Sequence, residues 1–281
     1  MLLRCHDVDR LRAAVQGRRL RAGVAASVDG MSLGAAFELA CMRSYWMAAR
    51  EASLASIADT VIDTSGRAAV VRATLDGDRA QVTDTHGSPQ FEVSPISRRS
   101  DLAGTEGSLV RQRFVRSLKA SGFAPELARA LARAFFEMAD NVVQHSGEDE
   151  EHPACGMWGY HVQDRWMCFA VADTGRGVLA SLRTSPRFAD LKDGQQAIRA
   201  AVQTGATRRT EETVGGGFKE VHHALAGIHG FLRFRSDDAC LQLDGRGSKK
   251  HAALGASAPL NGFQLAVSCS LDASSSGERA L

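Results

Sequence analysis

Apolar residues recur every three or four positions in two neighbouring stretches near the middle of the chain. This spacing predicts amphipathic helices over residues 107–120 and 125–145. The second helix would bury a single apolar stripe made of Leu127, Leu131, Phe135, Met138 and Val142. Two short apolar runs follow, at 156–163 and 166–172, and their length and composition predict strands.

Helical and strand-like patterns continue through the rest of this region. A helix is predicted over 191–203 and another over about 218–228, separated by a polar loop at 204–214. Strands predicted at 230–235 and 262–270 close the region. We therefore expect it to be a domain with a core of its own.

The first hundred residues carry weaker patterns. Residues 7–18 predict a short helix. The stretch 31–58, rich in Ala, Leu and Met, predicts one long helix or two, capped by Ser32. Strand-like runs at 67–74 and 79–84 flank an Asp-Gly pair, which indicates a hairpin.

Residues 84–106 are rich in Thr, Gly, Ser, Pro, Arg and Asp, and they predict a linker or surface loop between two units. The chain would then comprise a smaller N-terminal α+β unit of unknown role (1–100), a larger domain (107–270) and a flexible tail (271–281).

Composition excludes several classes of protein. With 34 basic and 32 acidic residues the formal net charge is +2, which gives no electrostatic reason to expect nucleic acid or an anionic membrane as a partner. The six cysteines lie far apart without a C-x-x-C pair, so neither a metal site nor a disulfide scaffold is indicated. No signal peptide is visible, and no apolar run approaches the ~20 residues of a membrane span. A cytoplasmic location is expected.

Glu137, Asn141 and His145 are spaced four residues apart on the second predicted helix. Each four-residue step turns the helix by only ~40°, so the three side chains project from one side of it, away from the apolar stripe. Alone, such a polar ridge is typical of a solvated helix face. Two further motifs change that interpretation.

Asp173 ends the strand-like run W-M-C-F-A-V-A and opens the sequence D-T-G-R-G. A carboxylate there would lie beside backbone that a ligand can approach closely, because Gly175 and Gly177 lack Cβ atoms. Three consecutive glycines then precede the helix predicted at about 218–228. Glycines that open a helix present N–H groups and the positive end of the helix dipole to an anion such as phosphate.

These motifs, in this order, resemble the boxes of GHKL ATP-binding domains, which histidine kinases, gyrase-like ATPases and anti-sigma-factor serine kinases share. E-M-A-D-N-V-V-Q-H-S resembles the N box, D-T-G-R-G the G1 box and G-G-G-F the G2 box. I-H-G-F-L-R-F-R-S is similar to the strand after the G2 helix, and N-G-F-Q-L-A-V to the closing strand with its usual glycine. The resemblance covers about residues 107–270. It implies a Bergerat fold, a two-layer α/β sandwich in which helices cover one face of a mixed β-sheet.

The resemblance also implies roles for the matching residues. Glu137 would act as general base, Asn141 would bind the Mg²⁺ that bridges the phosphates, and Asp173 would accept a hydrogen bond from the adenine amino group. The stretch 197–214 resembles a mobile ATP lid. The other residues implied to bind ATP are His145, Gly175, Gly177, Thr207, Arg208, Gly215, Gly216 and Gly217.

Two features bear on catalysis. Glu137 stands where most histidine kinases carry Asn, and it matches the ATPases and serine kinases of the superfamily. The G2 box lacks its later glycine, because Phe218, Lys219 and Glu220 stand where small and apolar residues normally follow. The first feature favours turnover and the second disfavours it.

A histidine kinase needs a phosphoacceptor histidine on a dimerising helical segment immediately upstream, and residues 107–136 contain no histidine. The sequence therefore predicts a regulatory ATP-binding protein, a Mg-dependent ATPase or a Ser/Thr kinase of the anti-sigma-factor type that acts on a protein partner. Two alternatives stay open. One is a nucleotide-sensing interaction module with little or no turnover, and the other is a histidine-kinase-derived signalling protein without its phosphoacceptor domain. A homodimer is also left open.

Overall fold

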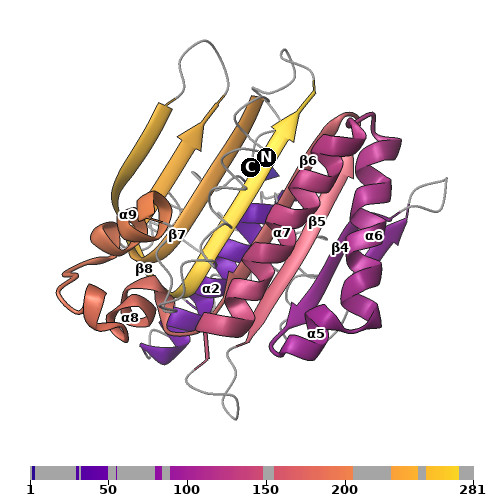
Figure 1. Ribbon diagram of the computed structural model, residues 1–281. Helices are drawn as coiled ribbons and strands as arrows, with labels where there is room; N and C mark the ends of the chain where they lie inside the picture. Colours follow the sequence, from indigo (N-terminus) through magenta and orange to yellow (C-terminus); the bar gives the residue numbers. More distant parts are fainter. Residues whose placement is uncertain are drawn as a thin grey trace.

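The computed structural model describes residues 2–3, 30–31, 33–49, 55, 80–83, 89–147, 155–204, 229–245 and 251–271 of the 281-residue chain. Most of them form an antiparallel β-sheet with helices on both sides (Figure 1). The helices are α2 (Leu33–Ala48), α5 (Arg99–Ala103), α6 (Thr105–Ala120), α7 (Pro125–His145), α8 (Gly177–Arg183), the 3₁₀ turn η2 (Pro186–Phe188) and α9 (Gly194–Thr204). The strands are β1 (Leu2–Leu3), β2 (Gly30–Met31), β3 (Ala80–Thr83), β4 (Pro89–Ile96), β5 (Gly156–Gln163), β6 (Trp166–Asp173), β7 (His229–Asp244) and β8 (His251–Ser270).

The main sheet has the strand order β3-β4-β5-β6-β8-β7, and all of its described pairings are antiparallel. The prediction of a mixed sheet is therefore wrong for these residues. The reason lies in the connections. Asp164 and Arg165, both with positive φ, join β5 to β6 in a two-residue hairpin. Between β4 and β5 the chain passes through the short α5 and the longer α6 and α7, which return it to the end where β4 finished. Within the described ranges, the parallel pairing is that of β1 with β2, outside this sheet.

Helices cover both faces of the sheet. Those of the predicted 107–270 domain that pack on it lie on one face, as predicted, whereas α2, from the first hundred residues, covers the other. On one side α5, α6 and α7 pack over large side chains of the sheet, such as Phe169 and Val171 of β6. On the other side α2 packs over small ones, such as Ala170 and Ala172. Because β6 is buried on both faces, its sequence is a continuous apolar run without polar alternation.

Most sequence-predicted elements of the second half are confirmed. Helix α7 occupies the predicted residues 125–145, with Pro125 at its first position, where a missing N–H is tolerated. The other confirmed elements are α6, β5, β6, α9 and both closing strands, and in the first half the stretches 31–58 and 79–84 contain α2 and β3. Helix α8 was not predicted. The elements predicted at 7–18, 67–74 and 218–228, the cap at Ser32 and the tail after residue 271 lie outside the described residues.

The linker predicted at 84–106 is wrong for residues 89–106, which form β4, α5 and the start of α6. Two prolines in β4 give this strand the composition of a loop. Pro89 begins the strand, and Pro95 lies past Val93, the last β4 residue that β3 pairs with, so its missing N–H breaks no bond to β3. Because β4 pairs with β5 along its length, the sheet continues across the predicted boundary.

Strand β7 is longer than predicted because it reverses direction in its middle. The register with β8 shifts at Asp237, a residue with a φ of +54°. The second half of β7 then returns beside the first, and the Gly245 amide donates to the Gly230 carbonyl at 2.8 Å (Figure 1). This turn lies at the end of the strands next to α8 and α9, because its side chains accept hydrogen bonds from the first residues of both helices. In the described part of the chain, no helix is long and apolar enough to cross a membrane.

Candidate functional site

Asp173 is the last residue of β6, and its carboxyl group is buried although the strand ends there. Its side chain is 1 % exposed, and Oδ1 accepts a hydrogen bond of 2.7 Å from the Gly175 amide. This contact closes the D-T-G turn on itself, because an aspartate side chain can reach the amide two residues further on. The prediction that a buried carboxylate ends this strand is confirmed.

The second oxygen of this carboxylate differs from the first. Oδ2 of Asp173 is buried and accepts no hydrogen bond from any residue that the structure describes. Burial raises the pKa of Asp173 to about 7, and the charge of Asp237 adds to the rise. The nearby Ser146 hydroxyl and the backbone N–H groups of Gly175 and Phe263 lower the pKa in turn, and none of them hydrogen-bonds Oδ2. Asp173 is therefore a buried carboxyl group whose pKa lies near neutrality.

Two glycines press against this carboxyl group and its turn. A Cβ atom on Gly262, in β8, would lie 2.1 Å from the Asp173 carbonyl oxygen and 2.3 Å from Oδ1. A Cβ atom on Gly175 would lie 2.2 Å from the Ser146 carbonyl oxygen. Gly262 also has a φ of +70°, which side-chain-bearing residues rarely adopt. Close approach to backbone therefore requires glycine at both positions.

The loop after β6 is attached to the end of α7. The Arg176 amide donates to the Ser146 carbonyl at 3.2 Å, and the Arg176 guanidinium donates to the Gly147 carbonyl. Since Ser146 directly follows α7, these contacts bring the end of α7 and the loop after β6 together. The two segments are 32 residues apart between Asn141 and Asp173 but adjoin in the fold.

The three candidate residues of α7, Glu137, Asn141 and His145, differ in exposure. Glu137 is exposed, whereas Asn141 and His145 are half-buried. Phe136 marks the flank of α7 that faces α6, because the Arg111 guanidinium of α6 lies 5.4 Å from the centre of its ring. At ~100° per residue, Asn141 lies ~140° and His145 ~180° round the helix from Phe136, on the flank away from α6. This places both on the β6 side of α7, and the end of α7 adjoins the Asp173 turn.

The predicted phosphate-binding residues Thr207, Arg208, Gly215, Gly216 and Gly217 lie outside the described residues. Gly177 is described, and it begins α8 with a φ of +78° against the side chain of Asp237. The described half of the predicted site therefore consists of the N-box flank, the G1 loop and the closing strand.

Sequence reasoning missed three consecutive polar residues at the β7 turn. The Ser236 hydroxyl accepts from the Val178 amide at 2.9 Å and donates to the Gly262 carbonyl at 2.8 Å. Asp237 accepts from the Leu179 amide at 3.1 Å, which satisfies a second N–H of the first turn of α8. Asp238 accepts from the amide of Gly194, at the start of α9. The signal was available in the dipeptide Asp237-Asp238, which is typical of a tight turn.

Replacing Ser236 by alanine should lower the free energy of unfolding by about 1–3 kcal/mol, because a partly buried amide and a buried carbonyl would each lose a partner. Denaturant unfolding measures the loss. Ser257→Ala is the matched control, since its hydroxyl makes a single long contact of 3.4 Å to the next carbonyl. Equal losses in the two variants would contradict the capping role of Ser236.

A cavity of about 370 Å³ adjoins the glycines that touch Asp173. Its wall combines Gly175 and Arg176 of the G1 loop with Tyr45 of α2, the β7 turn and the β8 turn at residues 259–262. Asp193, Asp237 and Asp238 supply acidic groups to this wall, and Arg176 and Lys192 supply two basic ones. Glu137, Asn141 and His145 do not line this cavity. It therefore lies on the side of the site formed by the loop after β6.

No protein-family model matches the chain, and no curated protein matches it either. The interpretation of the site therefore depends on the residues and geometry described above.

Proposed function

We propose that this chain binds Mg-ATP at a GHKL-like site formed by α7, the loop after β6 and the closing strand β8. The proposal is carried by one observation, the buried Oδ2 of Asp173 that no described residue hydrogen-bonds. A buried acceptor without a donor destabilises a protein, and it persists where a ligand supplies the donor. The exocyclic amino group of adenine is a donor of this kind.

The surroundings of Asp173 suit a flat, uncharged ring better than phosphate. Gly175 and Gly262 let the Ser146 and Asp173 backbone pack tightly round the carboxyl group, and the adjoining cavity carries three aspartates against two basic residues. The three aspartates outnumber Arg176 and Lys192 in this wall, so it suits a neutral base or ribose better than a triphosphate. We therefore place the base on the G1 side of the site and the phosphates on the N-box side, next to Asn141.

Asn141 would contribute one amide oxygen to Mg²⁺, and the phosphates would supply most of the other ligands. Within the described ranges, no group of three or more His, Cys, Asp and Glu side chains could hold a metal ion. In this proposal the ion enters with the nucleotide and is not held by the protein alone.

Glu137 is the residue proposed to act as general base. It is exposed on α7, one helical turn before Asn141, where it can meet a hydroxyl group of a docked protein or a water molecule. This exposure favours a Ser/Thr kinase or ATPase that acts with a protein partner. The altered G2 sequence at Phe218–Glu220 favours the second candidate, a module that senses nucleotide and does not turn it over.

Titration calorimetry with Mg-ATP tests the proposal. Asn141→Ala should weaken binding about tenfold in the presence of Mg²⁺, equivalent to ~1.4 kcal/mol, and have little effect when EDTA removes the ion. Glu137→Ala should leave affinity unchanged but lower any turnover by about 10²–10⁴-fold, because a general base acts mainly in the transition state.

Glu126→Ala is the control for Glu137→Ala, since Glu126 is an exposed glutamate on the first turn of the same helix. Failure of the wild-type chain to bind Mg-ATP would refute the proposed function. If it binds but releases no ADP in the presence of its partner, and ATP still alters the affinity for that partner, the sensing module is the correct interpretation.

A further inference from the structure

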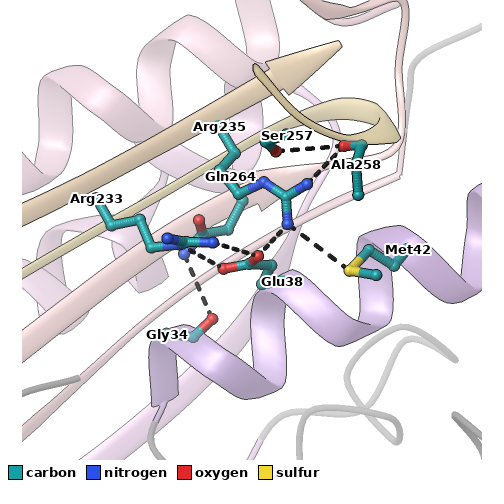
Figure 2. A network of polar contacts seen from close by, with 8 residues as sticks. All are labelled: Gly34, Glu38, Met42, Arg233, Arg235, Ser257, Ala258 and Gln264. Atoms are coloured by element: carbon teal, nitrogen blue, oxygen red, sulfur yellow. Dashed lines mark hydrogen bonds and ion pairs between the residues drawn. The ribbon is translucent and has the colours of Figure 1, made fainter. Parts of the chain in front are cut away.

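A buried ion network joins α2 to strand β7 on the sheet face opposite α7 (Figure 2). Both oxygens of the Glu38 carboxylate accept from the Arg233 guanidinium at 2.9 Å, and the Arg235 guanidinium also donates to Glu38. The three side chains are 0–1 % exposed. Burial alone would raise the pKa of Glu38, but the charges of Arg235 and Arg233 hold it below its ordinary value, so the carboxylate is ionised.

Burying three charged side chains carries a large desolvation penalty, so this network is an expensive way to attach α2 to the sheet. Apolar side chains of similar volume often stabilise a buried interface as well or better, and a buried ionic group is best understood where it fixes one arrangement. Arg233 and Arg235 alternate with Phe234, so both point to the α2 side of β7, and the Gln264 amide of β8 adds a contact of 3.4 Å to the Gly34 carbonyl. These directional contacts specify one position of α2 along the strands, in addition to the apolar packing around them.

Two routes connect this network to the Asp173 turn. The first is direct, because the Cys41 thiol of α2 donates to the Asp173 backbone carbonyl at 3.4 Å. Burial raises the pKa of Cys41, so the thiol remains a neutral donor. The second passes through the sheet. Arg235 binds the Ala258 carbonyl at 2.5 Å and directly precedes Ser236, which holds Gly262 and the start of α8.

We infer that Glu38 is a positioning residue for the Asp173 site, acting through Arg235, Ser236 and Gly262, and that α2 is a structural part of that site. This inference builds on the proposed function. The position of α2 and the affinity for nucleotide are then coupled. Such coupling is reciprocal, so each affects the other by the same free energy. A change in the N-terminal part of the chain that shifts α2 alters nucleotide affinity, and bound nucleotide holds α2 in place.

Glu38→Gln in the full chain tests this role, because it removes the charge and keeps the size. The matched control is Glu92→Gln. Glu92 is a second buried carboxylate, bound by Arg113 at 2.5 Å and by the Tyr160 hydroxyl at 2.8 Å, on the α6 side of the sheet. Both variants should melt at a lower temperature, since each removes a buried carboxylate that an arginine binds, although Arg113 keeps its second partner Glu106 at 2.9 Å.

Hydrogen exchange without nucleotide separates the two variants. Glu38→Gln should speed exchange of the amides at 174–179 about tenfold or more, equivalent to ~1.4 kcal/mol of local stability, whereas Glu92→Gln should leave them within about twofold of the wild type. In the wild type, Mg-ATP should slow exchange in α2. Equal acceleration by both variants, or none by folded Glu38→Gln, would overturn the inference.

Nucleotide affinity is the second readout. Glu38→Gln should raise the Kd for Mg-ATP about tenfold, with no such change in Glu92→Gln. If the wild type does not bind Mg-ATP, the proposed function fails, but the exchange rates at 174–179 still decide the role of Glu38.

A second pair of variants covers the case in which Glu38→Gln does not fold. Cys41→Ala removes the thiol that donates to Asp173, and Cys41→Ser keeps a donor there. Cys41→Ala should speed exchange at 174–179 about threefold, and Cys41→Ser should restore the wild-type rate. Wild-type exchange in Cys41→Ala would contradict the direct route from α2 to the site.

Discussion

Replacing Asp173 by asparagine should stabilise the free protein and at the same time weaken its binding of Mg-ATP. The amide keeps an oxygen for the Gly175 N–H but carries no charge, so it avoids the desolvation that raises the pKa of Asp173 from 3.8 to about 7. That difference of about three pH units corresponds to at most about 4 kcal/mol of unfolding free energy above neutral pH. Loss of a charge-assisted hydrogen bond should weaken nucleotide binding about 10- to 100-fold.

The effect on stability should depend on pH in a defined direction. Between pH 3.8 and about 7, folded wild-type protein keeps a proton on Asp173 that the unfolded chain releases. The folded state therefore binds more protons, and the unfolding free energy of the wild type falls as the pH rises through this window. The advantage of Asp173→Asn should grow from near zero at pH 4 to its maximum above pH 7.

Denaturant unfolding of both proteins from pH 4 to 8 measures this difference. Asp190→Asn removes an exposed carboxylate and serves as the control for the change in net charge. A variant that is less stable than the wild type at every pH, or that binds Mg-ATP as tightly, would show that Asp173 is a structural residue and not a ligand acceptor. Gain of stability with loss of binding is the pattern expected at a functional site.

Local sequence patterns were sufficient to predict the elements that carry the site. The spacing of Leu131, Phe135 and Met138 marks the buried stripe of α7, and these residues are buried as predicted. The apolar run before Asp173 marks β6, and the glycines after it mark a turn. Each of these signals depends on neighbours within a few residues, which is the range over which periodicity and turn chemistry act.

The features that were missed depend on contacts between distant residues. Glu38 meets Arg233 across 195 positions, and nothing near either residue in the sequence indicates a buried ion pair. Pro89 and Pro95 give β4 the local signals of a loop, and only its pairing with β5 makes it a strand. Tertiary pairing overrode local preference there, so β4 and the packing of α2 on the sheet could not be predicted from pattern, although α2 and β3 themselves were.

The largest loss of stability at the site is expected from Gly262→Ala. The new methyl group would lie 2.1 Å from a carbonyl oxygen and 2.3 Å from the Asp173 carboxylate, so either β8 or the Asp173 turn must move. The left-handed backbone at a φ of +70° adds ~1–2 kcal/mol to an overpacking cost of ~1–3 kcal/mol, which gives a loss of about 2–5 kcal/mol. Because the clash is with Asp173 itself, binding of Mg-ATP should weaken as well.

Two glycines separate the causes of that loss. At Gly255, on the same strand, a new methyl group would have no described heavy atom within 4 Å, so Gly255→Ala should change stability by less than about 0.5 kcal/mol. Gly122 has a φ of +86° but only ordinary contacts of 3.5 and 3.9 Å at that position, so Gly122→Ala should show the backbone cost alone, about 1–2 kcal/mol. Neither control should alter the affinity for Mg-ATP. If Gly262→Ala loses no more stability than Gly122→Ala and binds nucleotide normally, the Asp173 turn tolerates a side chain at its closing strand, and the close approach there is not required by the site.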